Sequence, residues 1–278
     1  MYTKAQLTAH IRAMGLRPDE TLLIHSSMKS IGPVEGGADT VLDAWMDYFR
    51  EEGLLLFPTH TWAQIGPDYP TFDPAAEPSC VGLLTNLFRQ RPGVVRSLHP
   101  THSVAAYGRD AAAYVAGEEN ADTPCPRNGC WGRLIDRRAR VLFLGCELTH
   151  NTFLHGVEEW NHVPGRIGTT PQALRIVLPD GRILERPSYR HDCPGIDISE
   201  QYDKMERPFL ATGIAVEGRF GDAHCVLCDA AGMAELTSRC LARNPQLFID
   251  KQPVPEAWYS GLRWRNGRLE ERGTEDVR

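Results

Sequence analysis

Long apolar runs, basic charge and cysteine are all scarce in this sequence of 278 residues. The longest apolar runs, Gly53–Pro58 and Val141–Cys146, fall far short of the ~20 residues that a membrane-spanning helix needs. Lys and Arg total 30 against 36 Asp and Glu, whereas a nucleic-acid-binding protein normally has a basic surplus. We therefore expect no membrane and no nucleic acid as partner. The net charge of -6 favours a cationic small molecule.

The eight cysteines are too sparse for a disulfide-stabilised scaffold. Residues 1–12 contain no apolar segment typical of a secretory signal, so we expect reduced thiols and a cytoplasmic location. Cys225 and Cys228 could form a zinc site with His191 and Cys193. The second C-x-x-C pair of such sites is missing, and the first pair follows a strand pattern, in which buried thiols pack as small apolar groups. We predict no metal site.

The order of apolar segments in the first part of the chain predicts a parallel sheet. Thr21–His25 and Leu54–Phe57 have the composition of buried strands, and helix-spaced apolar residues lie between them from Ala38 to Phe49. Strand, helix and strand in this order form a βαβ unit, and Arg140–Leu144 adds another buried strand. We predict an α/β core over residues 1–165, with a central, mostly parallel sheet and flanking helices.

The pattern changes after residue 165, where two strand pairs replace the alternation of strands and helices. The first pair flanks a Pro-Asp-Gly turn at 179–181, which predicts a hairpin. The second pair lies near Ile214–Val216 and Ala223–Leu227. We predict that residues 166–278 form a smaller antiparallel lobe packed on the core, so that residues 1–278 are a single domain.

The segment that follows the first strand has the composition of an anion-binding loop. Its hydroxyls, backbone N–H groups and one Lys precede a predicted helix N-terminus, where such groups can hold phosphate oxygens. Arg96 and Ser97 could add a second contact, because Arg binds phosphate as a bidentate fork. The spacing matches no phosphate-binding fingerprint, so a solvated connector stays open as the alternative. The residues of this loop are His25, Ser26, Ser27, Met28, Lys29, Ile31 and Gly32.

Ser26 and Lys29 also match the S-x-x-K spacing of serine acyl-enzymes, in which the serine is the nucleophile. Such enzymes carry S-D-N and K-T-G partner triplets. Neither triplet occurs in this chain. A serine amidohydrolase that uses Ser26 and Lys29 is therefore a weaker alternative.

His155 and Glu158 form the sharpest candidate pair for proton transfer. Three residues apart on a predicted helix, they share one face, so the carboxylate can orient the imidazole and stabilise its protonated form. A general base that takes a proton from an attacking amine needs this arrangement. A His–Glu pair on the protein surface can have the same spacing, however, so a surface pair stays open as the alternative. His25, at the end of the first strand, could likewise be either a site residue or a core histidine.

Taken together, these segments resemble the aminoglycoside 3-N-acetyltransferase family, also called the antibiotic N-acetyltransferases. Several short motifs in one order are more specific than any single motif, and the R/Q-x-x-G-x-G/A loop of the unrelated GNAT acetyltransferases does not occur. The resemblance covers most of the chain and rests on residues 22–32 (LLIHSSMKSIG), 36–37 (GG), 55–59 (LLFPT), 71–74 (TFDP), 94–103 (VVRSLHPTHS), 151–158 (NTFLHGVE), 191–193 (HDC) and 218–223.

The resemblance implies an antibiotic N-acetyltransferase fold that transfers acetyl from acetyl-CoA to the 3-amino group of an aminoglycoside. It implies that His155 is the catalytic base, with Glu158 beside it, and that Asp73 contacts the aminosugar or supports the base. The residues expected to hold acetyl-CoA are His25, Ser26, Ser27, Met28, Lys29, Ile31, Gly32, Arg96, Ser97 and Ser103.

Aminoglycosides are polycations, so we expect carboxylates to line their pocket. Asp73, Glu158 and Asp192 lie in segments that resemble the family, and we expect them to bind the substrate. Glu159 is expected to be a solvated surface charge. The alternatives are an acetyl-CoA-dependent transferase acting on another amine of secondary metabolism, and the serine amidohydrolase. A homodimer is a possible assembly.

Overall fold

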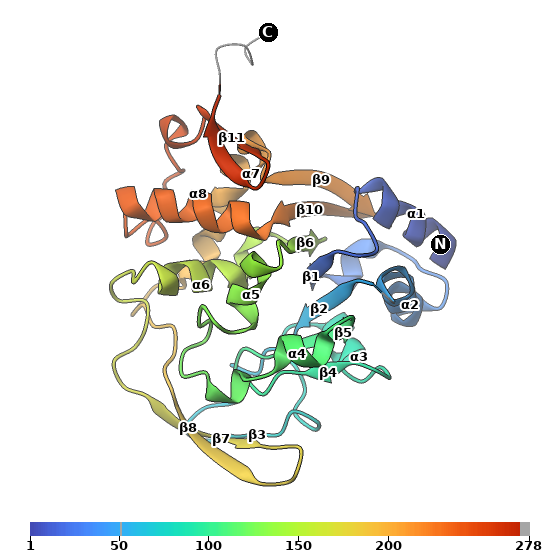
Figure 1. The fold of residues 1–278 in the computed structure, drawn as a ribbon, viewed down its shortest axis with the longest axis vertical. Coiled ribbons are helices and arrows are strands. Elements are labelled where there is room, and N and C mark those ends of the chain that lie inside the picture. Colours follow the sequence, from blue (N-terminus) through green and yellow to red (C-terminus); the bar gives the residue numbers. More distant parts are fainter. Residues whose placement is uncertain (51, 273–278) are drawn as a thin grey trace.

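A seven-stranded sheet forms the centre of the molecule (Figure 1). In this computed structural model, which describes residues 1–50 and 52–272, the strand order is β4-β5-β2-β1-β6-β10-β9. The middle strands β2, β1 and β6 run parallel, and the strands on either flank pair antiparallel. The predicted α/β fold is confirmed. The strands are β1 (Thr21–Ser26), β2 (Leu54–Pro58), β4 (Val95–Arg96), β5 (Val104–Gly108), β6 (Arg140–Leu144), β9 (Ala215–Phe220) and β10 (Ala223–Asp229).

A smaller sheet and a hairpin complete the strand content of the described residues. The small sheet contains the hairpin predicted around the turn at 179–181, and its third strand comes from the proline-rich segment after β2. The second predicted strand pair, β9 and β10, joins the central sheet, because β10 pairs with β6. The C-terminal part of the chain therefore contributes to both sheets. The remaining strands are β3 (Thr71–Phe72), β7 (Gln172–Val177), β8 (Ile183–Ser188), β11 (Leu262–Arg265) and β12 (Arg268–Glu271).

Helices cover both faces of the central sheet (Figure 1). α1, α2 and α3 pack against one face, and α4 to α8 pack against the other. No helix in the two described ranges is both long and apolar enough to span a bilayer. The helices are α1 (Lys4–Ala13), α2 (Gly37–Phe49), α3 (Leu83–Phe88), α4 (Ala111–Val115), α5 (Cys130–Asp136), α6 (Thr152–Trp160), α7 (Glu206–Thr212) and α8 (Ala230–Arg243).

Successive side chains along each strand point to opposite faces of the sheet, so the molecule has two separate hydrophobic cores, one on each face. On β1, Leu22 packs with α1 and α2, and its neighbour Leu23 packs with α5 and α6 on the opposite face. The same alternation separates Cys225 from Cys228 on β10, because residues three apart on a strand point to opposite faces. The two thiols cannot bind one metal ion, so the zinc alternative built on them is wrong.

Candidate active site

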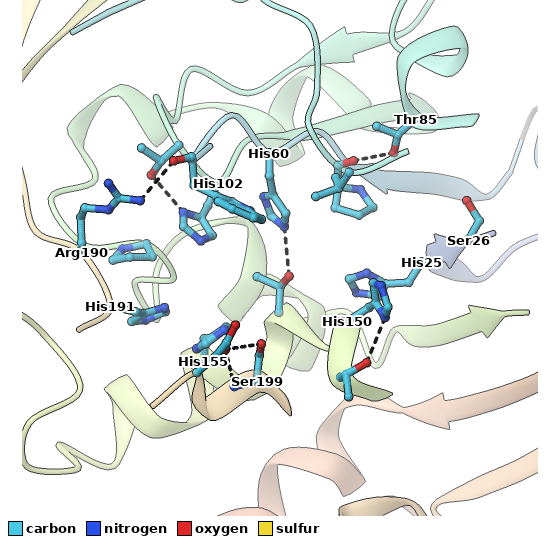
Figure 2. A pocket seen from close by; sticks show the side chains of 18 residues that line it. His25, Ser26, His60, Thr85, His102, His150, His155, Arg190, His191 and Ser199 are labelled. Atoms are coloured by element: carbon cyan, nitrogen blue, oxygen red, sulfur yellow. Dashed lines mark hydrogen bonds between the residues drawn. The ribbon is translucent and has the colours of Figure 1, made fainter. Parts of the chain in front are cut away.

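The carboxyl ends of the three parallel strands meet at one edge of the central sheet, where a cavity of about 430 Å³ lies. β1 ends with His25 and Ser26, His60 follows β2, and Thr152 begins α6 after β6. Open α/β sheets bind ligands at this edge. Figure 2 shows the histidines that surround the cavity, which are His25, His60, His102, His150, His155 and His191.

A hydrogen-bonded chain lies behind His155. The Tyr202 hydroxyl oxygen is 2.8 Å from Nδ1 of His155, and the hydroxyl donates to Oε2 of Glu158 at 2.7 Å. Nε of Arg166 donates to Oε1 of Glu158 at 2.6 Å, in an ion pair whose side chains are only 2% and 1% exposed. The expected direct contact between His155 and Glu158 is therefore wrong. The carboxylate turns to the buried guanidinium and reaches the imidazole only through Tyr202.

This chain fixes the tautomer of His155. Tyr202 has one hydroxyl proton and gives it to Glu158, so its oxygen can only accept the proton on Nδ1 of His155. Nε2 is then the nitrogen that is left to accept a proton. Burial, together with the nearby His191, lowers the pKa of His155 well below its ordinary value, so the imidazole is neutral at neutral pH. A neutral imidazole with a free nitrogen at a cavity can act as a general base.

A second His–Glu pair lies against the first. The His191 ring stacks on His155 with centroids 4.3 Å apart and planes at 21°, and its Nε2 is 2.6 Å from Oε1 of Glu159. The same oxygen accepts the backbone N–H of Cys125 at 2.8 Å. The side chain of Glu159 is only 6% exposed, so the expectation of a solvated charge is wrong. Burial raises the pKa of Glu159 to about 7.

Cys125, Glu159 and His191 place their potential ligand atoms within 4.8 Å of one another, close enough for a metal ion. Two features favour hydrogen bonding instead. Glu159 and His191 are bonded directly to each other, and burial raises the pKa of the Cys125 thiol well above its ordinary value. Zinc binds the thiolate, which burial disfavours. The group is therefore a hydrogen-bonded pair beside a protonated thiol.

The loop predicted to hold acetyl-CoA reaches the cavity through its first residues. His25 and Ser26 line the cavity, and His25 also stacks on the core residue Phe143 at 5.2 Å. Ser27 accepts a hydrogen bond from the Ser30 hydroxyl at 3.0 Å. His25 is thus both a core histidine and a cavity residue, and burial lowers its pKa to about 3.

The rest of this loop forms a short 3-10 helix over Met28–Ile31, where Lys29 is exposed. Within the described ranges no hydrogen bond joins Lys29 to Ser26, so nothing supports activation of a serine nucleophile. Ile31 is fully buried in the core and Met28 packs against it, so the side chain of Ile31 cannot touch a ligand. The 3-10 helix directs the Ile31 side chain inward, so the structure does not support the expected contact of this side chain with acetyl-CoA.

Arg96, Ser97 and Ser103 do not line the cavity, contrary to expectation. Ser97 is fully buried, donates to Glu118 at 3.4 Å and accepts the N–H of Val104 at 3.0 Å. The Arg96 guanidinium is saturated by groups of the protein itself, and burial lowers its pKa to about 9. It joins β2 to the proline-rich loop. The partners of Arg96 are the carbonyls of Thr59, Pro74 and Glu77 and the hydroxyls of Thr59 and Ser103.

Replacement of Arg96 by Gln should therefore act on stability and not on coenzyme binding. A hydrogen bond to a charged group is worth about 1.5–3 kcal/mol, so the free energy of unfolding should fall by at least about that amount. The KM for acetyl-CoA should stay almost unchanged in the folded variant. Urea denaturation and steady-state kinetics measure the two effects. A raised KM with native stability would show that Arg96 binds the coenzyme after all.

The carboxylates are distributed differently from the prediction. Asp73 accepts the N–H groups of Ala75 and Ala76 in a turn and does not line the cavity, and Glu158 is buried away from it. The structure does not support their expected contacts with substrate, because both carboxylates bond to groups of the protein itself. Asp192 lines a hollow of about 350 Å³ beside His155, together with Asp197, which also lines the main cavity.

Tyr202 and Arg166 were missed by sequence reasoning. Tyr202 lies 47 residues from His155 in the chain and Arg166 lies 8 residues from Glu158. One signal was present, since Glu158 shares the apolar face of α6 with Leu154. A carboxylate on a buried helix face requires a cationic partner.

A cavity at the carboxyl edge of parallel strands, lined by histidines, is typical of an α/β enzyme that acts on a small molecule. The family follows from comparison with known proteins. The chain belongs to the aminoglycoside 3-N-acetyltransferase family, whose model matches residues 23–242. This confirms the resemblance found in the motifs.

Known proteins similar to this chain agree with that family. Aminoglycoside N(3)-acetyltransferase VII of Streptomyces paromomycinus is 29% identical over 259 residues, which cover 84% of this chain and 89% of that protein. A histidine-to-alanine variant of AAC(3)-IVa in complex with a gentamicin has a TM-score of 0.77 at 27% identity, covering 92% and 93% of the two chains. AAC-IIIb with CoASH shares the fold, with a TM-score of 0.77 at 24% identity over 91% of this chain and 99% of that one.

Proposed function

We propose that this protein transfers the acetyl group of acetyl-CoA to the 3-amino group of an aminoglycoside, with His155 as the general base. Family membership supports the reaction. The observation that carries the role of His155 is its hydrogen-bonded chain, in which Arg166, Glu158 and Tyr202 leave Nε2 of a cavity imidazole as an acceptor.

In this mechanism the amine attacks the thioester directly. The nitrogen lone pair forms a bond to the carbonyl carbon, and Nε2 of His155 takes the proton that the nitrogen must lose. The carbon–sulfur bond then breaks, and its electron pair leaves with the sulfur of coenzyme A. Ser26 lines the cavity, but no basic side chain among the described residues bonds to it, so an acyl-serine intermediate is not required.

The acetyl donor fits the end of the cavity formed by β1 and α3. Ser26, Val81 and Thr85 line this end, with Ser26 and Thr85 together at one side of Figure 2. The exposed Lys29 lies just beyond Ser26, where its ammonium can meet a phosphate. AAC-IIIb is known with CoASH, which supports coenzyme A as the donor.

The acceptor fits the side of the cavity where the segment after β8 passes His155. Asp192 and Asp197 lie on this segment, and carboxylates there can bind the ammonium groups of a polycation. Asp197 was not anticipated from the sequence. The complex of the AAC(3)-IVa variant with a gentamicin supports an aminoglycoside as the acceptor.

Free thiol release tests this proposal. The protein is incubated with acetyl-CoA and a panel of aminoglycosides, with single-amine compounds as the comparison. We expect thiol release that depends on the aminoglycoside and gives one amide per thiol. Release only with other amines would refute the aminoglycoside. Hydrolysis of an amide without acetyl-CoA would refute acetyl transfer.

A further inference from the structure

Two consecutive glutamates of α6, Glu158 and Glu159, hold the two stacked imidazoles in different environments. The Glu158 carboxylate lies 2.6 Å from the Arg166 guanidinium. Burial raises the pKa of Glu158, and the positive charge of Arg166 partly offsets this rise. Glu159 bonds to the Thr123 side chain, to the backbone N–H of Cys125 and to His191. Within the described ranges no Lys or Arg side chain bonds to it. Adjacent carboxyl groups in such different environments take different protonation states.

The protonation of Glu159 and His191 depends on the lack of a positively charged side chain beside Glu159 among the described residues. A buried carboxyl group without a counter-charge favours its protonated form, and burial raises the pKa of Glu159 to about 7. The 2.6 Å contact with Nε2 of His191 is then a carboxyl group donating to an imidazole nitrogen. His191 must carry its own proton on Nδ1. His155 therefore offers an acceptor nitrogen, and the ring stacked on it offers a donor.

We propose that His191 is the general acid of the transfer reaction and protonates the departing thiolate, with Glu159 supplying the replacement proton. This inference rests on the proposed acetyl transfer. As the carbon–sulfur bond breaks, its electron pair goes to sulfur, which takes the Nδ1 proton of His191. Nε2 of His191 takes the carboxyl proton of Glu159, which becomes a carboxylate. The proton gained by His155 and the proton lost by Glu159 balance, and solvent restores both groups after the products leave.

The spacing of the two rings suits these roles. The attacking nitrogen and the leaving sulfur are bonded to the same carbon, so the groups that serve them must lie side by side. His155 and His191 do so, with ring centroids 4.3 Å apart, and both line the cavity (Figure 2). Alkyl thiols are weak acids, so an alkyl thiolate leaves more easily when it is protonated. An acid of this kind contributes about 10²–10⁴ to a rate.

The proposal fixes the direction of a pH effect. The pair must hold its shared proton, so kcat should fall as the pH rises through about 7, the pKa of Glu159. His155 cannot produce this fall, because an imidazole with a lowered pKa is already neutral there. The titratable groups that face the pair are His99, His102, Asp122, Cys125, His155 and Arg166.

A change of leaving group tests the acid in the native protein. An acetyl thioester of 4-nitrothiophenol releases a thiolate that needs no proton, whereas acetyl-CoA releases an alkyl thiolate. We expect the fall in kcat above about pH 7 with acetyl-CoA and no fall with the aryl thioester. The same fall with both donors would overturn the proposal.

Two variants sharpen the test. Glu159→Gln keeps a hydrogen bond to Nε2 of His191 but has no acidic proton, and His191→Asn replaces the imidazole with an amide that cannot act as an acid. With acetyl-CoA both should reduce kcat by about 10² or more and abolish the fall at high pH. With the aryl thioester both should be close to native. His155→Ala is the matched comparison, because it should be slow with either donor.

Other outcomes separate this proposal from its rivals. Equal losses with both donors, or a change only in the KM for the acceptor, would make the pair structural. One zinc ion per chain that disappears in Cys125→Ser would make it a metal site and would also overturn the proposal. If the native protein acetylates another amine and no aminoglycoside, the substrate assignment fails and the donor comparison is run with that amine.

Discussion

Replacing His155 with Ala should lower kcat by about 10²–10⁴, the usual contribution of a general base. The KM for acetyl-CoA should barely change, because the base serves the amine and not the coenzyme. The imidazole lines the cavity, and Tyr202 fixes the nitrogen that takes the proton. Steady-state kinetics by thiol release measures both constants.

His224→Ala is the control for this substitution, since His224 is an exposed histidine on β10 whose ring bonds to Glu217 and which is not one of the residues that line the cavity. It should retain native kcat. Near-native turnover of the His155 variant would make His155 structural. His25 would then be the next candidate for the base, because it also lines the cavity.

Replacing Arg166 with Met should cost about 3–5 kcal/mol of folding stability, the usual effect of removing one partner from a buried ion pair. Arg166 and Glu158 are 2% and 1% exposed, so the variant leaves an uncompensated carboxylate in the core. Turnover should fall as well, because Arg166 no longer holds the Glu158 carboxylate that orients the Tyr202 hydroxyl. Chemical denaturation measures the stability, and kcat measures the effect on the base.

The double variant Arg166→Met with Glu158→Gln separates charge from packing. It removes the unpaired carboxylate and should recover much of the lost stability. In the single variant, the unpaired Glu158 has a folded-state pKa above its unfolded value, so its cost is present above that pKa and is relieved as the pH falls through it. The stability deficit should therefore shrink in acid. A deficit that does not change with pH, and that the second substitution does not repair, would contradict the ion-pair account.

The sequence predicted the local parts of the fold well. The buried strands at Thr21, Leu54 and Arg140 and the hairpin at 179–181 all form, because apolar patterning and turn residues act over short distances. The position of β10 beside β6 was not predicted. An antiparallel strand pair has the same pattern whether it forms its own sheet or extends another.

The sequence predicted the centre of the site but not its surroundings. His155 and the loop after β1 were identified from the motifs, whereas the surroundings of each side chain could not be. Glu158 and Glu159 are neighbours of one residue type, yet among the described residues an arginine pairs with Glu158 and a histidine with Glu159. Arg96 was predicted to bind phosphate because the sequence does not distinguish an arginine whose guanidinium is fully hydrogen-bonded within the protein from one that is free to bind a ligand. Burial and hydrogen-bond partners, which decide these roles, are properties of the tertiary structure.

The most direct test of the central claim is the structure of the product formed by the native protein and by His155→Ala at matched concentrations. Acetyl-CoA and an aminoglycoside are incubated with each protein, and the acetylated nitrogen is located by NMR. The account predicts one singly acetylated aminoglycoside, modified at the 3-amino group, from the native protein and almost none from the variant. Acetylation at another nitrogen, or equal product from both proteins, would contradict it.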